Sequence, residues 1–432
     1  MKKRINIGLL GLGTVGSGVY AILKKRRREL KRLVDADIVV KAIAVKDLKE
    51  VKNRPELKVD PATVTTDAAA IVHDPEIDII VELIGGREPA RSLILEALRH
   101  GKQVVTANKE VIANDGEEVL SLADEMGVDV LFEASVGGGI PIIHPLKEGL
   151  VGNKISRIVG IVNGTTNYIL SRMTADGISF KEALKEAQKN GYAERNPDAD
   201  VEGGDAAAKI AILSSIAFND RVKAPQVYRE GISAITPDDI RYADEMGYVI
   251  KLLAIGKEEA DGLDVRVHPA MIDKSHPLAG VNDVFNAIFV EGDAVGEVMF
   301  YGRGAGSLPA ASAVVGDIVT AARDIQNNDT GKIGCTCFEI KPVKPIGDLV
   351  SSFYLLIESN DKPGVLAQVS KVFGDANVSL ASVIQKNGAG NSAQLVFITY
   401  PVKEKNLRAA VAKIEKLEVV KKVVNVIRVE SV

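Results

Sequence analysis

The most constraining feature of the chain is the segment RINIGLLGLGTVGSGVYAIL at residues 4–23. It predicts a short apolar strand, a Gly-x-Gly-x-x-Gly turn and a helix from about residue 15. In such a turn the first glycine permits the tight bend, the second lets the backbone approach a pyrophosphate, and the third allows the helix to pack closely on the strand. The alternative is a glycine-rich turn that binds nothing. The context favours a dinucleotide site with contacts at Gly11, Gly13, Thr14, Val15 and Gly16.

The same segment superficially resembles a signal peptide or a membrane span, because it follows a basic start and carries no charge from Ile5 to Leu23. Its glycines are too many for a helix that is stable in lipid, and no small-residue cleavage site follows. The basic run at residues 24–28 is typical of the solvated end of a helix. We therefore expect neither a leader nor a membrane partner.

Length and composition exclude other classes of protein. A chain of 432 residues with 46% hydrophobic and 26% charged residues predicts two or three globular domains. A net charge of -4 and the absence of tryptophan argue against a nucleic-acid partner, so the substrate should be small. Cys335 and Cys337, the two cysteines of the chain, have no zinc-type spacing. We expect a cytoplasmic protein in which both thiols are reduced and structural.

The following segments alternate as in a doubly wound α/β sheet. Strands are expected at residues 37–45, 77–86, 102–108 and 128–135, and helices at residues 88–101 and 109–127. This order predicts a parallel, Rossmann-like sheet with ligands at the carboxyl ends of its strands. At the end of the second strand, Lys46 would favour the 2'-phosphate of NADP, whereas the adjacent Asp47 would favour the ribose of NAD.

A carboxylate-rich segment, residues 191–213, opens an alanine-rich helix near Gly204. Asp205 and Lys209 would lie four residues apart on one face of that helix, so the carboxylate can hold the ammonium group. From spacing alone, a surface salt bridge is the more ordinary interpretation. A lysine held in this way could also donate a proton to a carbonyl oxygen during hydride transfer.

Six blocks in this order resemble homoserine dehydrogenases: GLGTVGSGV, TANKEVIA, FEASVGGGIPI, GIVNGTTNYIL, GYAERNPDADVEGGDAAAKI and MFYGRGAGSLPAASAVVGD. The family reduces L-aspartate 4-semialdehyde to L-homoserine with NAD(P)H, and catalyses the reverse reaction, on the route to threonine, isoleucine and methionine. The resemblance implies that Lys209 is the general acid and base and that Asp205 is its partner. It also implies that Glu194 holds the amino group of the substrate and that Asp200 is a second acidic residue that lines that site. Asp198 and Glu202 match no family role and are expected to be solvated.

The resemblance assigns roles to three further segments. Lys109 would lie between the nicotinamide and the substrate, and Gly302 would approach the cofactor. A monovalent cation such as sodium would be held mainly by backbone carbonyls of Glu133, Val136, Gly138 and Ile140. The helix from about Pro309 would return to the first sheet. The expected division is an NAD(P)-binding domain at residues 1–140 plus about 305–325, an α+β catalytic and dimerisation domain at residues 141–304, and a linker at residues 326–348.

The remaining segment, residues 349–432, predicts the strand and helix order βαββαβ, which is ferredoxin-like. With the motif NDKPGVL it resembles an ACT domain, a module that commonly binds amino acids at paired interfaces. Asn360, Asp361, Gly364 and Ser379 are the expected contacts with an amino-acid effector, for which threonine is the first candidate. The alternative is a module that only dimerises. The resemblance implies a homodimer or homotetramer.

Two other functions stay open at this point. Another NAD(P)-dependent amino-acid dehydrogenase could share the first half of the chain, and it would be distinguished by its activity on L-aspartate rather than L-homoserine. A sensor without enzymatic activity could keep the ACT domain, although the presence of Asp205 and Lys209 argues against it.

Overall fold

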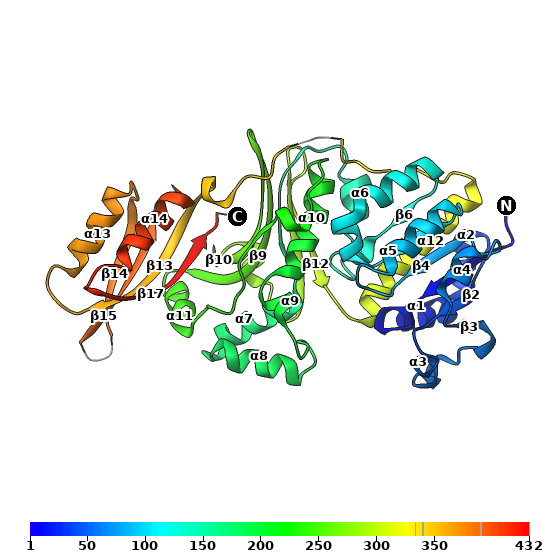
Figure 1. Ribbon diagram of the computed structural model, residues 1–432, viewed down its shortest axis with the longest axis horizontal. Coiled ribbons are helices and arrows are strands. Elements are labelled where there is room, and N and C mark those ends of the chain that lie inside the picture. The colour runs from blue at the N-terminus through cyan, green and yellow to red at the C-terminus, as the bar shows by residue number, and fades with distance from the viewer. Residues whose placement is uncertain (333, 339–340, 389–390, 432) are drawn as a thin grey trace. The chain divides into compact units, whose positions relative to one another are not determined.

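The computed structural model describes residues 1–332, 334–338, 341–388 and 391–431 (Figure 1). The chain divides into two compact units. The first comprises residues 1–158, 208–224 and 286–340, and the second comprises residues 159–207, 225–285 and 341–432. Each unit is described separately.

The first unit is built on a parallel sheet with the strand order β3-β2-β1-β4-β5-β6. The strands are β1 (Arg4–Leu10), β2 (Asp37–Ala44), β3 (Val64–Thr65), β4 (Ile79–Glu82), β5 (Gln103–Thr106) and β6 (Val130–Leu131). The connecting helices are α1 (Thr14–Lys25), α2 (Arg27–Val34), α3 (Lys49–Lys52), α4 (Ala68–His73), α5 (Ala90–Arg99) and α6 (Lys109–Met126). The order of strand and helix confirms the Rossmann-like fold.

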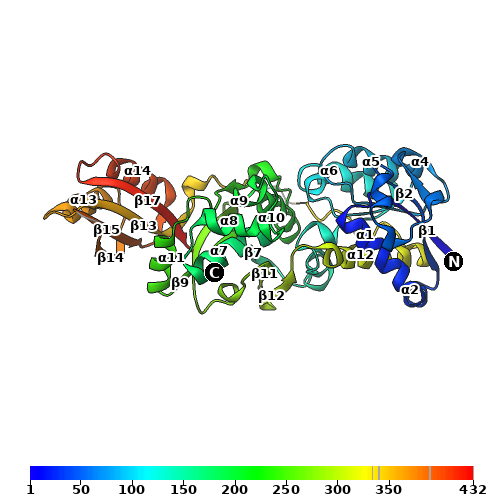
Figure 2. The ribbon, with the colours of Figure 1, turned by 90° about the horizontal axis from the view of Figure 1, so that it is seen from below.

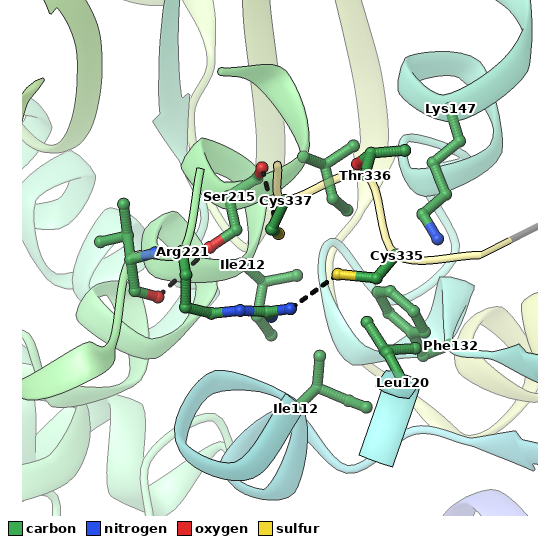
Figure 3. Close-up of a pocket in the computed structure, with 12 residues that line it drawn as sticks. Ile112, Leu120, Phe132, Lys147, Ile212, Ser215, Arg221, Cys335, Thr336 and Cys337 are labelled. Carbon is green, nitrogen blue, oxygen red and sulfur yellow. Dashed lines mark hydrogen bonds between the residues drawn. The ribbon is translucent and has the colours of Figure 1, made fainter. Parts of the chain in front are cut away.

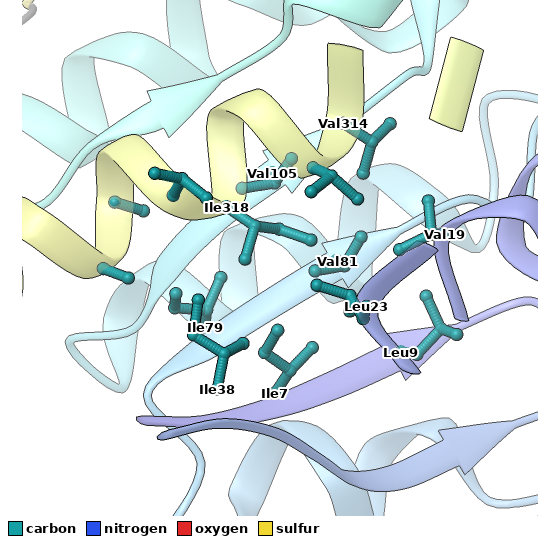
Figure 4. Close-up of a cluster of buried hydrophobic side chains, with 14 of the residues drawn as sticks. Ile7, Leu9, Val19, Leu23, Ile38, Ile79, Val81, Val105, Val314 and Ile318 are labelled. Carbon is teal, nitrogen blue, oxygen red and sulfur yellow. The ribbon is translucent and has the colours of Figure 1, made fainter. Parts of the chain in front are cut away.

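Alternation along the strands divides the core between the two faces of this sheet. Ile7 and Leu9 of β1 face a cluster that also contains Val19 of α1 and Ile318 of α12 (Ser307–Asn327) (Figure 4). Gly8, which lies between them, faces the opposite side, where a Cβ would come within 2.4 Å of Ile71 in α4. Because α12 belongs to this core, the first unit is completed by a segment from late in the sequence.

Two sequence predictions for this unit need correction. The expected strand at residues 128–135 is paired only at β6, and residues Glu133–Ser135 form a 3-10 turn because the Glu133 side chain caps a following loop. The basic run at residues 24–28 is not simply the end of one helix, since α1 ends at Lys25 and α2 begins at Arg27. The unit also contains β12 (Gly296–Arg303), which pairs with β11 (Phe285–Gly292), which pairs in turn with β7 (Ile155–Ile161).

The second unit contains strands in the order β9-β10-β17-β13-β15-β14. Its first part has β8 (Tyr228–Arg229), β9 (Tyr248–Glu259) and β10 (Gly262–Asp273), with α7 (Gly164–Asp176), α8 (Phe180–Lys189), α9 (Asp198–Val201) and α11 (Pro237–Glu245). Helix α10 (Gly204–Ala217) begins in this unit and ends in the first.

The C-terminal part has the predicted βαββαβ order. Its elements are β13 (Val350–Asn360), α13 (Val365–Asp375), β14 (Leu380–Asn387), β15 (Ser392–Thr399), β16 (Val402–Lys403), α14 (Glu404–Ile414) and β17 (Val420–Val429). Both helices pack on one face of the sheet (Figure 2), around a core that includes Phe353, Phe373, Phe397 and Leu407. The sheet is antiparallel within this part, but β17 also pairs in parallel with β10 through Ala270 and Arg428.

Candidate active site

The glycine turn after β1 is shaped by close contacts at its first and third glycines. Gly11 has φ +101°, and a Cβ there would lie 2.7 Å from the carbonyl oxygen of Leu83. A Cβ on Gly16 would lie 2.2 Å from the carbonyl oxygen of Gly11. A Cβ on Gly13 would meet no atom within 4 Å, so this backbone faces open space at the start of α1. The turn therefore leaves helix N–H groups accessible to a phosphate, as a dinucleotide site requires.

Two charged residues, Lys46 and Asp47, follow the end of β2, and they differ in their contacts. Asp47 accepts a hydrogen bond from the backbone N–H of Lys49 at 2.8 Å and so helps to shape the turn that leads into α3. The Lys46 side chain is exposed and makes no ion pair among the described residues. Of the two residues on which cofactor choice depends, Lys46 is thus the one available to an external anion.

Glu82 is a buried carboxylate at the carboxyl end of β4, an edge where ligands were expected, and the sequence pattern did not single it out. Its carboxylate accepts hydrogen bonds from Thr106 Oγ1 at 2.6 Å and from the backbone N–H of Ile84 at 2.8 Å. Burial raises the pKa of this carboxyl, while these hydrogen bonds favour its ionised form. An acidic residue inside the apolar run IDIIVELIGG was the signal that could have found it.

Lys109 is the first residue of α6 and is half-buried. Asn108 caps this helix, because its side-chain oxygen accepts the N–H of Val111 at 3.2 Å. The amide of Asn108 also donates to the carbonyl oxygen of Gly86 at 2.7 Å. The cap therefore fixes both the start of α6 and the loop after β4, two of the strand ends where ligands were expected.

The expected cation loop is held by the Glu133 side chain. Its carboxylate accepts three successive backbone N–H groups, from Ile142 at 2.5 Å, Ile143 at 2.8 Å and His144 at 2.8 Å. Gly137 and Gly138 have positive φ, and a Cβ on Gly138 would lie 2.3 Å from the carbonyl oxygen of Gly304. The side chain of Glu133 is thus used structurally, and only backbone oxygens of the loop remain as ligands.

An ion pair between the half-buried His144 and the buried Asp317 supports the same loop. His144 Nε2 lies 3.0 Å from Asp317 Oδ1, and the other oxygen of Asp317 accepts the backbone N–H of Glu133 at 2.9 Å. The hydrogen bond with Asp317 raises the pKa of His144 to about 9, and burial raises the pKa of Asp317 to about 6. The pair is therefore charged near neutral pH, with the proton on the imidazole.

Gly302 lies beside this loop, since a Cβ there would approach Ile140 at 3.2 Å. A few residues later, Ser307 donates to the carbonyl oxygen of Thr14 at 2.7 Å. The segment before α12 therefore links the expected cation loop to the glycine turn. Gly302 itself packs on the loop.

In the second unit, Asn163 brings two of the expected site carboxylates together. Its amide nitrogen donates to Asp200 Oδ1 at 2.7 Å and to Asp205 Oδ2 at 2.9 Å. Its oxygen caps α7 by accepting the N–H of Thr166 at 2.9 Å. Asp205 is buried and lies on α10, on the same helix as the half-buried Lys209, four residues later. Asn163 is the second residue that sequence reasoning missed, although its motif NGTTNYIL was noted.

The other carboxylates of this segment differ in their contacts. Glu194 is exposed, and its backbone carbonyl accepts a hydrogen bond from Gln188 at 3.1 Å. Asp198 and Glu202 are both exposed, as expected for solvated residues, and Glu202 also accepts a hydrogen bond from Ser233 at 2.9 Å. The carboxylate of Glu194 has no hydrogen-bond partner among the described residues, so it is available to bind a cation.

The expected effector contacts lie at the loops that flank α13. Asn360 ends β13, and Gly364 precedes α13 with φ +85°. The backbone N–H of Asp361 bonds to the carbonyl oxygen of Asn391 at 3.3 Å, and Ser379 is exposed just before β14. A Cβ on Gly364 would meet open space, so the first turn of α13 is accessible.

Three family models match successive parts of the chain. The model described as homoserine dehydrogenase matches residues 141–319, its NAD-binding domain matches residues 11–133, and an ACT domain matches residues 353–419. The homoserine dehydrogenase of Synechocystis is 50% identical over 438 residues, which cover 99% of this chain and 100% of that protein. The chain belongs to the homoserine dehydrogenase family.

Solved structures agree with this assignment. A homoserine dehydrogenase from Thiobacillus denitrificans superposes with a TM-score of 0.93 at 43% identity, and the match covers 99% of this chain and 98% of the other. A hyperthermophilic archaeal homoserine dehydrogenase in complex with NADPH superposes with a TM-score of 0.63 at 28% identity, over 74% of this chain and 97% of the other. This chain is accordingly an NAD(P)-dependent oxidoreductase that acts on a CH–OH group, and the other two functions are not favoured. Within the part of the chain that the structure describes, no helix is both long and apolar enough to span a membrane.

Proposed function

We propose that the chain interconverts L-aspartate 4-semialdehyde and L-homoserine, with Lys209 as the proton donor and acceptor. NAD(P)H supplies the hydride. As the carbonyl oxygen of the aldehyde gains negative charge, a proton from the Lys209 ammonium neutralises it, and in the reverse direction Lys209 accepts the hydroxyl proton. Asp205 holds the ammonium in the position that this transfer requires.

The observation that carries the proposal is the Asn163 bridge between Asp200 and Asp205. Two carboxylates that accept hydrogen bonds from one amide group are held in fixed positions. One of them, Asp205, lies on the same helical face as Lys209, because residues four apart on a helix are neighbours. A lysine oriented by an already fixed carboxylate is suited to proton transfer rather than to a loose surface ion pair.

Asp200 and Glu194 are proposed to bind the ammonium group of the substrate. Homoserine carries a positive charge at neutral pH, and a carboxylate with no partner among the described residues, as in Glu194, can pair with it. Asp200 is half-buried and held by Asn163, so it can add direction to this contact. Lys109, at the start of α6, is proposed to lie near both the nicotinamide and the substrate.

The test is the change in nicotinamide absorbance with L-homoserine, measured separately with NAD and with NADP. Turnover with at least one cofactor is expected, and L-aspartate should give none. Absence of turnover with both cofactors, in folded protein that still binds a dinucleotide, would exclude the proposed reaction.

NADP is the proposed preferred cofactor, because Lys46 is exposed at the end of β2 while Asp47 is engaged in a turn. Lys46→Ala should raise the KM for NADP about tenfold, roughly the value of one charged contact, and leave the KM for NAD nearly unchanged. Lys49→Ala, which removes an exposed lysine of the same region, is the matched control. Equal effects of Lys46→Ala on both cofactors would contradict the assignment.

A monovalent cation, such as sodium, is proposed at the backbone carbonyls of Glu133, Val136, Gly138 and Ile140. Hard oxygen donors suit such an ion. No group of three or more His, Cys, Asp or Glu side chains that could hold a metal is found among the described residues, so backbone oxygens are the donors to consider. Sodium chloride should raise the melting temperature more than choline chloride at equal ionic strength if the site exists.

The ACT domain is proposed to bind an amino-acid effector at Asn360, Asp361, Gly364 and Ser379, with threonine as the first candidate. An effector inhibits only if it binds one conformational state better, and such coupling is typically about 1–3 kcal/mol. Threonine, methionine, isoleucine and serine should be compared for effects on activity and melting temperature. If none of them changes either quantity, the domain is a structural module.

The proposed domain division and assembly also need direct tests. We place the NAD(P)-binding domain at residues 1–140 plus about 305–325, the catalytic and dimerisation domain at residues 141–304, the linker at residues 326–348 and the ACT domain at residues 349–432. Helix α12 runs to Asn327, just inside the proposed linker. Limited proteolysis should cleave first in the linker, and light scattering should report a dimer or tetramer.

A further inference from the structure

Two cysteines that the proposed reaction does not use lie in a small cavity of the first unit (Figure 3). Cys335 and Cys337 belong to the segment that follows α12, and both are half-buried. The cavity measures about 20 Å³, which is room for about one water molecule. Apolar side chains from α6 and α10 form much of its wall, among them Ile112, Leu120, Ile212 and Ile216.

Two cations face the sulfur atoms in this cavity. Arg221 Nη2 lies 2.8 Å from Cys335 Sγ, and Arg221 Nε is buried with no hydrogen-bond partner among the described residues. Lys147 Nζ donates to the carbonyl oxygen of Gly334 at 3.2 Å and lies 5.2 Å from the centre of the Phe132 ring. Within the described residues neither cation forms an ion pair with a carboxylate. The charge of Arg221 is therefore directed at the Cys335 sulfur, and this contact favours the thiolate form of Cys335.

The pKa values of the two thiols shift in opposite directions. A hydrogen bond from the Cys337 thiol lowers the pKa of Cys335 to about 5, with further help from the Cys337 backbone N–H, Arg221 and Lys147. The same contact raises the pKa of Cys337, because removing its proton would place two negative charges side by side. Cys337 Sγ also lies 3.7 Å from the carbonyl oxygen of Ser215 on α10. The contact with Arg221 and these opposite pKa shifts favour a thiolate at Cys335 and a thiol at Cys337.

We propose that Cys335 and Cys337 form a peroxide-reactive site, in which Cys335 attacks the oxidant and Cys337 resolves the product to a disulfide. The geometry supplies the parts that such a site needs: a sulfur in contact with a guanidinium group, a second cation that lines the same cavity, and a second sulfur two residues away in that cavity. The small cavity favours hydrogen peroxide over bulkier disulfide oxidants.

The chemistry balances with hydrogen peroxide as the oxidant. The Cys335 thiolate attacks one peroxide oxygen, an S–O bond forms, the O–O bond breaks, and the departing hydroxide takes a proton to become water. The sulfur loses two electrons and the peroxide gains them, which leaves a sulfenic acid. Cys337 then loses its proton and attacks the Cys335 sulfur, so that an S–S bond forms and the S–O bond breaks with release of a second water. A disulfide between residues two apart closes a small ring, and strained disulfides are easily reduced again.

The test treats the full-length chain with hydrogen peroxide and analyses the peptide that contains both cysteines by mass spectrometry. The expected product has lost two hydrogen atoms and is restored by dithiothreitol. Cys337→Ser should instead accumulate a sulfenic acid that dimedone traps, while Cys335→Ser should form neither product. Formation of the dimedone adduct on Cys337 in Cys335→Ser, at the rate seen for Cys335, would reverse the assigned roles and overturn the proposal.

A second measurement compares alkylation rates. Iodoacetamide at about pH 7 should modify Cys335 at least about tenfold faster than Cys337, because the thiolate is the nucleophile. Arg221→Gln should slow the alkylation of Cys335 several-fold, whereas the matched control Lys332→Gln should not, since Lys332 pairs with Asp329 outside the cavity. If Arg221→Gln does not fold, the ratio of the two rates in the unmodified chain still decides. Equal rates for the two cysteines would overturn the proposal.

Discussion

The glycine turn and the cluster of Asn163, Asp200 and Asp205, two parts of the proposed binding site, are built in opposite ways. The turn is formed by the absence of side chains, because a Cβ on Gly11 or Gly16 would strike backbone atoms. The cluster is formed by side chains alone, through one amide that binds two carboxylates. A surface made of backbone can approach a cofactor closely, whereas a surface made of fixed carboxylates can orient an ammonium group. The two parts should therefore fail differently when mutated.

The largest expected effect comes from removing the proton donor of the second part. Lys209→Met should lower kcat by about 10²–10⁴, the usual loss for general acid catalysis, and leave the dissociation constant for NADP nearly unchanged. Steady-state kinetics and dinucleotide titration on the same folded preparation measure both quantities. Lys189→Met, which removes an exposed lysine at the end of α8, is the control and should keep its kcat. Normal turnover of Lys209→Met would show that Lys209 has no catalytic role and is an ordinary helix residue.

A pair of glycine variants separates packing from binding in the turn. Gly16→Ala forces a Cβ against the carbonyl oxygen of Gly11 and should cost about 1–3 kcal/mol of unfolding free energy. Gly13→Ala meets no protein atom and has an ordinary φ of -68°, so its melting temperature should not fall. Its methyl group would occupy space needed by the pyrophosphate and should raise the dissociation constant for NADP about tenfold or more. Unchanged NADP affinity in Gly13→Ala would place the cofactor elsewhere.

Asn163→Ser tests whether the amide bridge positions the catalytic groups. Serine remains a good helix cap, so α7 and the melting temperature should be little affected. Loss of the two hydrogen bonds to Asp200 and Asp205 should lower kcat about tenfold, because bonds to charged groups contribute about 1.5–3 kcal/mol. NADP affinity should not change. A fall in melting temperature with unchanged kcat would show that Asn163 is only a cap.

The smallest expected effect is on the pH dependence of stability and comes from the ion pair of His144 and Asp317. This pair lies in the same unit as the glycine turn but is formed by side chains. The pKa of His144 is raised from 6.5 to about 9, so the folded state binds its proton more tightly than the unfolded state does. This stabilisation is fully present below about pH 6.5 and is lost as the pH rises to about 9. Asp317, with a pKa of about 6, is mostly ionised throughout that window.

The melting temperature should therefore fall by a few degrees, an order-of-magnitude expectation, between about pH 6.5 and pH 9. His144→Gln, which cannot take up a proton, should remove most of this fall. An identical pH dependence in the variant would assign it to other groups.

The same contrast explains what the sequence could predict. The turn is a local pattern within a few residues, and the Rossmann-like and ferredoxin-like orders follow from periodicity along single strands and helices. Asn163 contacts carboxylates 37 and 42 residues away, and no local pattern reports such a pairing. The hydrogen bond of Glu82 could not be predicted for a similar reason, because its partner Thr106 lies on the neighbouring strand. The shortened β6 depends on Glu133, whose side chain caps a loop that had no signature of its own.

Because β17 pairs in parallel with β10, the C-terminal module also covers the edge of a strand outside that module. Ala270 and Met271 of β10 have their hydrogen-bonding edge occupied by Arg428 and Val429, and the buried Arg266 bonds to Ser351 and to Glu430 of the same module. A chain cut before β13 would leave this edge bare and this guanidinium without those partners, and bare strand edges invite pairing with other molecules. The C-terminal module thus also covers a strand edge that could otherwise pair with another molecule. Removing the C-terminal module from the protein would expose the edge of β10, which could then pair with a strand of another molecule.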